Sequence, residues 1–414
     1  MESMLFLLVL GFISVGYCLD QLSAFLNLGA FRLAPVPEFR GRVTDDAFSK
    51  SRQYCSVNTW FGFLSSTFSL FLILGMIFFG GFNVVDQFIR SYFHPSTSEI
   101  MLGLAYIFSL YFGSSLLNIP FSLYKTFVIE AKFGFNQMTL RTFFLDYFKG
   151  GFLSIFLGGG LLSALLWFFS VMGASAWVWC WILYMVFQGV MMIIAPLWIM
   201  PLFNRFEPLD ECVLKTRICA CSKRLGFDIE GVYVMDGSRR STKANAFFSG
   251  FGASRRIVFY DTLIKNHSVD ELAAIFTHEV GHYKHHHMIK GLLLSGLQGG
   301  VMFYVLDLVL LHPGLFQVFS MSHHSIYASF VFFGFLYLPL GLLIGLFGNY
   351  LSRRFEYQAD AYVIQNGEDL EGYINALKTL SIDHLSHLTP HWLKVCLSYS
   401  HPPVLERINA LREL

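Results

Sequence analysis

Long runs of apolar residues dominate the chain, and they are spaced by shorter polar segments. A membrane-spanning helix needs about 20 consecutive apolar residues. Seven runs approach or exceed this length, at about residues 4–19, 59–82, 100–123, 151–172, 177–200, 289–311 and 325–351. The pattern predicts an α-helical integral membrane protein with about seven transmembrane helices.

The first run, residues 4–19, is short enough to be a signal peptide. A signal peptide carries a basic segment before its apolar part and two small residues at its cleavage site. Here Glu2 precedes the run, and the VGYCL that ends it offers no such site. We therefore expect a retained membrane anchor.

The basic residues are distributed unevenly between the polar segments. The chain has 29 Lys and Arg, and all of them except Arg90 and Lys290 lie on one set of alternate polar segments. These segments are the connections before runs 2, 4 and 6 and the tail after run 7. Cytoplasmic loops are rich in Lys and Arg. Residues 203–288 and 352–414 are therefore expected to face the cytoplasm together, with the N-terminus on the opposite side. The membrane would be a bacterial inner membrane or, in a eukaryote, that of the endoplasmic reticulum.

Composition agrees with a lipid bilayer as the main partner. Hydrophobic residues make up 55% of the chain and charged residues only 14%, against about 25% charged in soluble domains. A net charge of +1 gives no reason to expect a nucleic acid. The seven cysteines include a lone C-x-C at Cys219 and Cys221, which we interpret as ordinary thiols.

The two polar segments divide the chain into four parts. Residues 1–202 form a membrane domain with five spans, and residues 289–351 add two more. Within 203–288, β-rich runs at 231–238, 243–251 and 255–263 predict a small antiparallel sheet of β-hairpins. The tail, 352–414, is expected to be helical. We therefore predict a small α+β unit beside the membrane helices.

One motif in the first polar segment carries chemistry. SVDE at 268–271 is a capping box that predicts a helix start, and THEVGHYKHHH follows at 277–287. His278 and His282 then share one helical face, with Glu279 beside them. This H-E-x-x-H spacing is typical of zinc peptidases. The alternative is an interfacial helix with solvated histidines, and we expect His285, His286 and His287 to be such a solvated flank.

A third protein ligand is needed for a catalytic zinc site. SRRFEYQADAYV at 352–363 places Glu356 and Asp360 four residues apart on the same predicted side of the membrane. Glu356 is the candidate third ligand, and Asp360 the candidate hydrogen-bond partner of a ligand histidine. The alternative is a surface helix in which these acids pair with Arg353 and Arg354.

With these motifs the chain resembles the zinc-metalloprotease type of CAAX prenyl protease, a seven-span membrane family. The resemblance runs from about residue 120 to the end and rests on FVIEAKFGFNQMT (127–139), MPLFNRFEPL (200–209), MDGSRRSTKANAFFSGFGASRRIVFYDTL (235–263), RRFEYQADAY (353–362) and SYSHPPVLERI (398–408). It implies a metalloendopeptidase that hydrolyses peptide bonds, a fold that encloses an intramembrane chamber, and one Zn²⁺ at its cytoplasmic end.

The resemblance also implies roles for individual residues. The zinc ligands would be His278, His282 and Glu356, and the general base would be Glu279. His401 would stabilise the oxyanion. The substrate, a peptide or protein with or without a C-terminal prenyl group, would pair with a strand at Asn245 and Ala246, and Arg407 would orient His401 or bind the substrate carboxylate. The alternatives are an exposed helix arginine for Arg407 and a turn histidine before Pro402 for His401.

Other functions fit the sequence less well. A metal transporter needs ionisable residues inside its spans, and in the interior of the seven runs only Asp307 is ionisable. In site-2-type intramembrane proteases the H-E-x-x-H lies within a span, whereas here it precedes one. A quality-control peptidase of a related family, or a broader peptidase for non-prenylated peptides, would use the same chemistry. The short connection at about 312–324 leaves a bacterial origin open.

Overall fold

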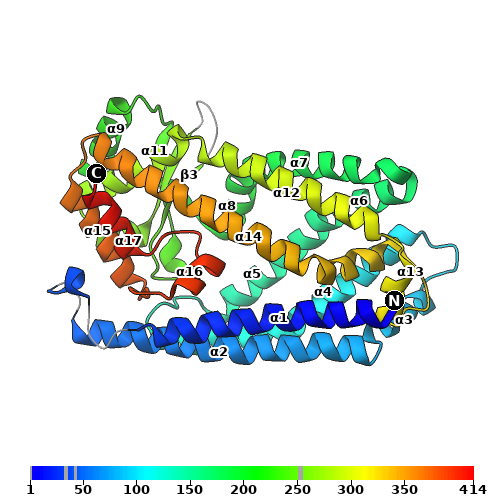
Figure 1. Ribbon diagram of the computed structural model, residues 1–414. Helices are drawn as coiled ribbons and strands as arrows, with labels where there is room; N and C mark the ends of the chain where they lie inside the picture. Colours follow the sequence, from blue (N-terminus) through cyan, green and yellow to red (C-terminus); the bar gives the residue numbers. More distant parts are fainter. Residues whose placement is uncertain (1, 32–35, 42–43, 250–254) are drawn as a thin grey trace.

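Long helices run side by side through most of the molecule, and a smaller unit of short helices and strands lies at one end (Figure 1). The computed structural model describes residues 2–31, 36–41, 44–249 and 255–414. The end of the β-rich run predicted at 243–251 and the start of the one at 255–263 flank the gap, and residues 250–251 lie outside the described residues. The C-terminus belongs to the smaller unit, and the N-terminal helix begins at the opposite end.

Seven helical segments of the described chain are long and apolar enough to cross a membrane, which confirms the predicted number of spans. They are α1 (Glu2–Gly29), α2 (Asp45–Phe78), α4 (Glu99–Tyr124) with the π-helical η2 (Lys125–Glu130), α5 (Leu140–Leu153) with η3 (Ser154–Gly158) and α6 (Gly159–Val171), α7 (Ala176–Ile194) with η5 (Ala195–Ile199) and α8 (Met200–Phe203), α12 (His287–Val309) and α14 (Ile326–Gln365).

Most of these helices are longer than the apolar runs that predicted them. The clearest case is α14, which continues for 14 residues past the predicted end of the last span at residue 351. Residues 352–365 contain no Gly or Pro and are rich in good helix formers. One helix therefore leaves the membrane region and enters the smaller unit without interruption.

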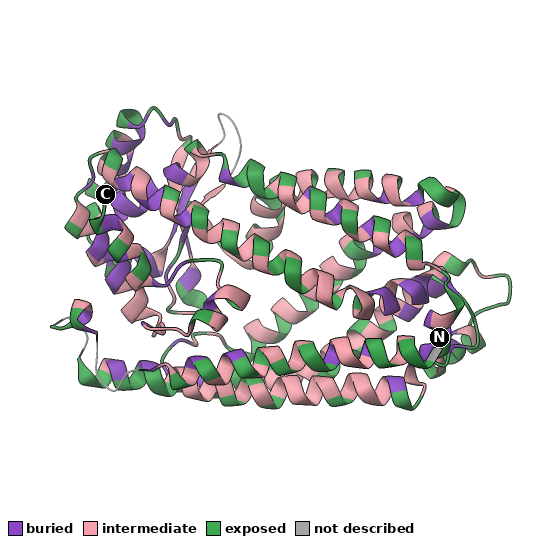
Figure 2. Cartoon of the chain, viewed as in Figure 1, coloured by how far each residue is buried: buried purple, intermediate pink, exposed green. Residues whose placement is uncertain are grey.

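The spans are not packed into a solid core. Their apolar windows bury between 0% and 22% of their residues, and Figure 2 shows intermediate and exposed residues along most of their length. Burial is greater where the short helices α3 (Gly81–Tyr92) and α13 (Pro313–Val318) cover the end that holds the N-terminus.

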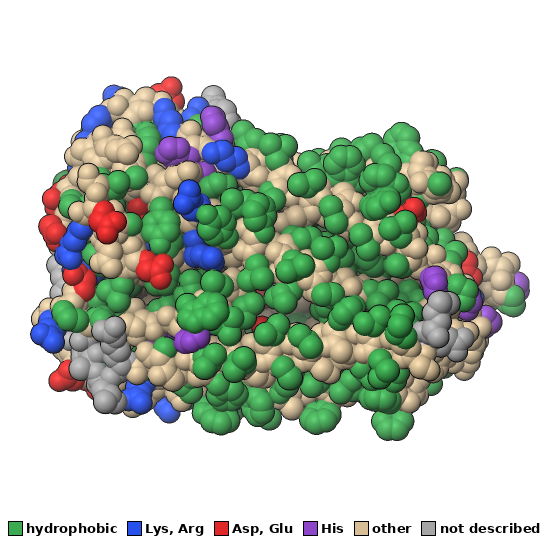
Figure 3. Space-filling view, in the orientation of Figure 1, with side chains coloured by type: hydrophobic (Ala, Val, Ile, Leu, Met, Phe, Trp, Pro, Cys, Tyr) green, Lys and Arg blue, Asp and Glu red, His purple; other side chains and the backbone are tan. Residues whose placement is uncertain are grey.

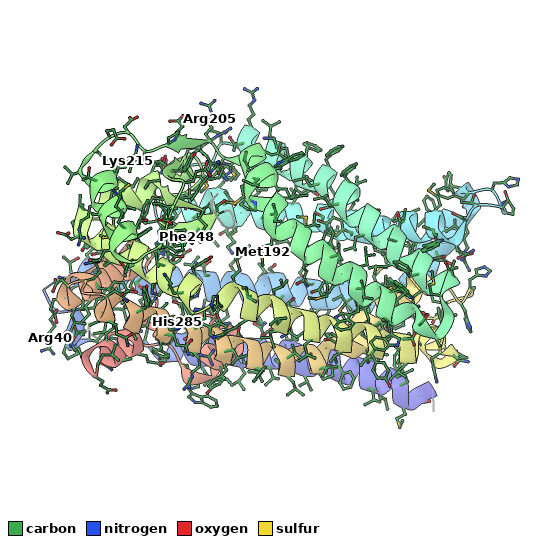
Figure 4. All side chains as sticks on the ribbon, turned by 90° about the horizontal axis from the view of Figure 1, so that it is seen from above. Arg40, Met192, Arg205, Lys215, Phe248 and His285 are labelled. Carbon is green, nitrogen blue, oxygen red and sulfur yellow. The ribbon has the colours of Figure 1, made fainter. Side chains whose placement is uncertain are left out.

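Charge separates the two parts of the molecule. Hydrophobic side chains cover the helical part in Figure 3, whereas Lys, Arg, Asp and Glu gather over the smaller unit. Arg40, Arg205 and Lys215 come from distant parts of the sequence and all lie at this end (Figure 4). The charge asymmetry of the sequence is therefore an asymmetry of the folded molecule.

The sheet in the smaller unit differs from the prediction. It has four strands in the order β1-β2-β4-β3: β1 (Phe206–Pro208), β2 (Gly231–Met235), β4 (Arg256–Tyr260) and β3 (Ala246–Ser249). β3 and β4 are an antiparallel pair, but β2 and β4 are parallel. The prediction of a purely antiparallel sheet was wrong because β3 and its preceding turns form a crossover that returns the chain to the sheet beside β2.

The two polar segments pack together in two hydrophobic clusters. The remaining helices are α9 (Val213–Arg224), α10 (Asp261–Asn266), α11 (Val269–Lys284), α15 (Leu370–Asp383), α16 (Trp392–Ser398) and α17 (Val404–Arg412). Ala376 of α15 packs in the cluster that contains Phe276 of α11, and Ala274 of α11 packs against Val363 and Ile408. This packing holds α11 between the sheet and the end of α14.

Candidate metal centre and active site

The H-E-x-x-H residues lie on α11, which begins as the sequence predicts. Ser268 and Glu271 form the reciprocal hydrogen bonds of a capping box, so that prediction is confirmed. Further along, Gly281 faces α14, where an added Cβ would lie 3.1 Å from the Cα of Ala359. The absence of a side chain at Gly281 therefore lets the two helices approach closely enough to share a site.

His278, His282 and Glu356 converge between α11 and α14. Their potential ligand atoms all lie within 4.8 Å of one another. The Nε2 atoms of the two histidines are 3.1 Å apart, and the carboxylate of Glu356 lies 3.6 Å from His278 Nε2 and 3.3 Å from His282 Nε2. Three donor atoms from two helices thus face one point.

The far side of the His278 ring is held by a buried polar group. His278 Nδ1 lies 3.0 Å from Asp360 Oδ1 and 2.9 Å from the hydroxyl of Tyr373. Burial raises the pKa of Tyr373 well above its usual value, so its hydroxyl remains protonated and donates to Asp360. The Asp360 carboxylate and the Tyr373 oxygen can each accept a hydrogen bond from Nδ1–H, which leaves the Nε2 lone pair of His278 free for a metal.

The His282 ring is held in the same way by residues that were expected to be solvated. His282 Nδ1 is 2.9 Å from His287 Nδ1, and His287 Nε2 is 2.9 Å from Gln358 Oε1. Because Gln358 Oε1 only accepts, His287 must donate from Nε2 and accept at Nδ1. His282 then carries its proton on Nδ1, and its Nε2 is also free for a metal.

His287 is therefore not part of a solvated flank, and that prediction was wrong for this residue. His287 is 6% exposed and begins α12, whereas His286 is exposed and His285 half-buried. The left-handed backbone of His286, with φ 56°, breaks α11 and starts a new helix. This turn returns the ring of His287 toward His282.

The donor set fits a zinc ion. Two neutral imidazole nitrogens and one carboxylate oxygen are the ligands of many catalytic zinc sites, which keep a fourth position for water. Arg407 Nη1 lies 3.5 Å from Glu356 Oε2, so a guanidinium supports the charged form of the carboxylate. Each histidine has its other nitrogen hydrogen-bonded, as metal-ligating histidines almost always do.

A cleft of about 710 Å³ opens at this centre, within the size range of ligand-binding pockets. Glu279 and His401 both line it. Burial raises the pKa of Glu279 above its usual value, which brings its carboxylate closer to the range of a general base at neutral pH. His401 Nε2 lies 3.3 Å from Glu356 Oε1, and its side chain is 65% exposed.

Asn245 and Ala246 lie along the same cleft. β3 is an edge strand of the sheet and begins at Ala246. The Asn245 carbonyl accepts from Tyr260 N–H, so backbone groups of Ala246 point to the open edge by the alternation of an antiparallel pair. Asn245 Oδ1 accepts the Ala246 N–H at 2.9 Å.

Arg407 is buried at the base of the site. Its guanidinium donates to both oxygens of Asp360 and, at 3.1 Å, to Tyr373, and its side chain is 13% exposed. The alternative of an exposed helix arginine is therefore excluded. The pairing of Glu356 and Asp360 with Arg353 and Arg354 is not seen, because the Arg353 side chain instead donates to backbone carbonyls near α16.

Tyr373, His287 and Gln358 at the metal centre were not assigned by the sequence analysis, and the first two were missed for different reasons. Tyr373 belongs to no motif, and only the packing of α15 on α11 brings it to His278. His287 lies five residues after His282, a spacing that one straight helix cannot turn to the same face. The helix break at His286 that brings His287 back is a feature of the backbone, and no sequence signal indicated it.

Two family models together match most of the chain. "CAAX prenyl protease N-terminal, five membrane helices" matches residues 27–205, and "Peptidase family M48" matches residues 208–414. The second model includes every residue discussed at the metal centre.

Curated relatives and a solved structure agree with these models. The CAAX prenyl protease 1 homolog of Arabidopsis thaliana is 32% identical and aligns over 97% of this chain and 96% of its own length. The human homolog is 31% identical, with 92% and 89% coverage. A crystal structure of S. mikatae Ste24p superposes with a TM-score of 0.93 at 29% identity, covering 98% of each chain. The chain therefore belongs to the CAAX prenyl protease 1 family of M48 peptidases, which are membrane zinc metalloproteases.

Proposed function

We propose that the protein removes the last three residues from C-terminally prenylated CAAX proteins, with one Zn²⁺ bound by His278, His282 and Glu356. The observation that carries this proposal is the convergence of these three ligand atoms within 4.8 Å beside the edge strand that contains Ala246. Relatives named CAAX prenyl protease 1 support the substrate class.

The proposed mechanism assigns a separate task to each group. His278, His282 and Glu356 would hold a zinc ion, which would lower the pKa of a water molecule to about 7 and polarise a carbonyl. Glu279 takes a proton from the attacking water and returns it to the leaving amine. His401, exposed in the cleft, donates to the oxygen of the scissile carbonyl, and the open edge at Asn245 and Ala246 pairs with the peptide backbone.

Asp360 and Arg407 act behind the ligands in this proposal. Asp360 fixes the proton of His278 on Nδ1, and Arg407 holds Asp360 in place through two hydrogen bonds. The basic segments around this unit support a cytoplasmic orientation of the active site, in the membrane of the endoplasmic reticulum if the organism is a eukaryote.

Cleavage of paired peptides tests the proposal. Purified protein and its Glu279→Gln variant are incubated with a farnesylated CAAX peptide and its unmodified counterpart, and products are identified by mass spectrometry. We expect wild type alone to release the terminal tripeptide, and to do so from the farnesylated peptide. Equal cleavage of both peptides would remove prenyl specificity and favour the broader peptidase. Near-normal turnover by Glu279→Gln would contradict the assignment of the general base.

A further inference from the structure

We infer that Lys243 binds the C-terminal carboxylate of the substrate, and that His384 ends the backbone track along which the substrate lies. This inference rests on the proposed function, because a protease that releases a terminal tripeptide has a free carboxylate close to its scissile bond. A site for this carboxylate would explain why cleavage occurs at a fixed distance from the chain end.

The direction of a bound peptide follows from the open edge of β3. Antiparallel pairing is slightly more stable per residue than parallel pairing, and β3 runs from Ala246 to Ser249. A peptide paired antiparallel to it therefore points its C-terminus toward the residues that precede Ala246. These residues are Asn245, Ala244 and Lys243, all of which line the cleft.

His384 blocks the edge two residues before Ala246. Ala244 has the same edge orientation as Ala246 by the alternation of the strand, and its N–H donates to His384 Nε2 at 3.1 Å. The imidazole therefore occupies the place that the next carbonyl of a paired peptide would need. His384 caps α15 and also lines the cleft, so it forms the end wall of this track.

Lys243 presents a positive charge beside this wall. Its ammonium group donates hydrogen bonds to the Tyr54 hydroxyl at 3.0 Å and to Glu130 at 3.3 Å. It also lies 4.5 Å from the ring centroid of Phe135. Lys carries three donor hydrogens, so one is left for a ligand. The side chain remains 39% exposed and lines the cleft.

Arg407, the other cation that lines the cleft, has its guanidinium group bound to other side chains. Among the described residues that line it, the only Lys and Arg are Lys243 and Arg407. Arg407 is 13% exposed and its guanidinium is bound to Asp360 and Tyr373. An extended tripeptide spans about 10 Å, which places its carboxylate well away from the zinc ligands that Arg407 supports. Lys243 is therefore the cation that the end of the peptide meets.

Two farnesylated CAAX peptides that differ only at the C-terminus test the inference: one ends in a free carboxylate and the other in an amide. We expect the wild-type, zinc-loaded protein to cleave the acid with a kcat/KM about tenfold or more above that of the amide. A hydrogen bond to a charged group contributes enough binding free energy for a difference of this size. In Lys243→Met the ratio of kcat/KM for the acid to that for the amide should fall to about one, because only cleavage of the acid becomes slower. Lys243→Arg should restore part of this ratio.

Controls separate a binding role from a structural one. Lys265→Met removes an exposed lysine of α10 and should leave the acid-to-amide ratio unchanged. If Glu130→Gln abolished the ratio as fully as Lys243→Met does, loss of the Tyr54–Glu130–Lys243 network would explain the effect, and the inference would be overturned. A ratio of one in wild type would overturn it directly.

Binding by the Glu279→Gln variant gives the same comparison without turnover. This variant should bind the acid more tightly than the amide, and the difference should disappear when Lys243→Met is added. If wild type cleaves no CAAX peptide, the proposed function fails, and this binding difference still decides the role of Lys243. If wild type releases the tripeptide but neither measurement distinguishes acid from amide, only the role of Lys243 fails.

Discussion

At the residue scale, the site depends on which ring nitrogen carries each proton. His278 and His282 face the metal position with Nε2 because their Nδ1 atoms are bound to other groups. Asp360 and Tyr373 hold one ring, and His287 with Gln358 holds the other. The two histidines were visible as a motif, whereas of the four residues that set their tautomers the sequence indicated only Asp360.

Tyr373→Phe should weaken metal binding without unfolding the protein. The change removes one hydroxyl that contacts both Asp360 and His278, and loss of such an outer partner costs about 10–100-fold in metal affinity or activity. Zinc affinity is measured by competition with a chelator, beside Tyr362→Phe as a tyrosine of α14 outside the metal centre. Equal affinity in the two variants would contradict the role of Tyr373.

At the element scale, the active site is the contact between α11 and α14. Each helix supplies part of the ligand set, so the distance between the helices controls the distances between donor atoms. Gly281 lies where the two helices approach closely, next to Ala359 and Tyr362. The glycine in HEVGH is therefore a packing requirement as well as a spacer.

Gly281→Ala should separate these helices. The new Cβ would lie 3.1 Å from both the Ala359 Cα and the Tyr362 Cβ, and overpacking of this kind costs about 1–3 kcal/mol. Replacing Gly by Ala in a helix gains about 1 kcal/mol. Over most of its range, the cost of overpacking exceeds this gain. Thermal unfolding and zinc content are measured together, and both should decrease.

Gly291→Ala on α12 is the matched control, because in the part of the chain that the structure describes no atom outside its own helical turn lies within 4 Å of the added Cβ. It should unfold at the wild-type temperature or slightly above it. If Gly281→Ala behaved like this control, the close contact of α11 with α14 would not limit the geometry of the site.

At the scale of the whole molecule, distant segments of the chain meet in the smaller unit. The connection between α1 and α2 reaches the C-terminal helices through Glu38, which pairs with Arg412 and Lys378. Phe31 and Phe39 pack with Leu388 in a common cluster. The connection between α1 and α2 therefore packs against the C-terminal helices of the smaller unit, and a metal bound at the proposed site would add a link between α11 and α14.

Metal removal should lower the stability of the entire protein. A ligand present at 100 times its dissociation constant stabilises the folded state by about 2.7 kcal/mol, and here it joins segments that follow spans 5 and 7. Unfolding in detergent is compared with excess zinc and with a chelator. The midpoint should fall with chelator in wild type and change little in Glu356→Gln. An equal decrease in both proteins would show that the chelator acts elsewhere.

Much of this molecule is determined by local sequence. Apolar length alone predicts seven spans, and the capping box and H-E-x-x-H spacing predict α11 with His278 and His282 on one face. These features depend on residues close in sequence, for which a helix fixes the relative positions. The chemistry of the zinc ligands is therefore readable before any fold is known.

Other features required the tertiary structure because they join residues that local geometry does not relate. The parallel pairing of β2 with β4, the position of Tyr373 behind His278, and the contact of His384 with Ala244 each bring together segments separated by loops or whole helices. The return of His287 depends on a left-handed residue that composition does not indicate. The sequence by itself determined the spans and the candidate metal ligands, and the packing of distant elements decided how those side chains are oriented and where the proposed substrate track ends.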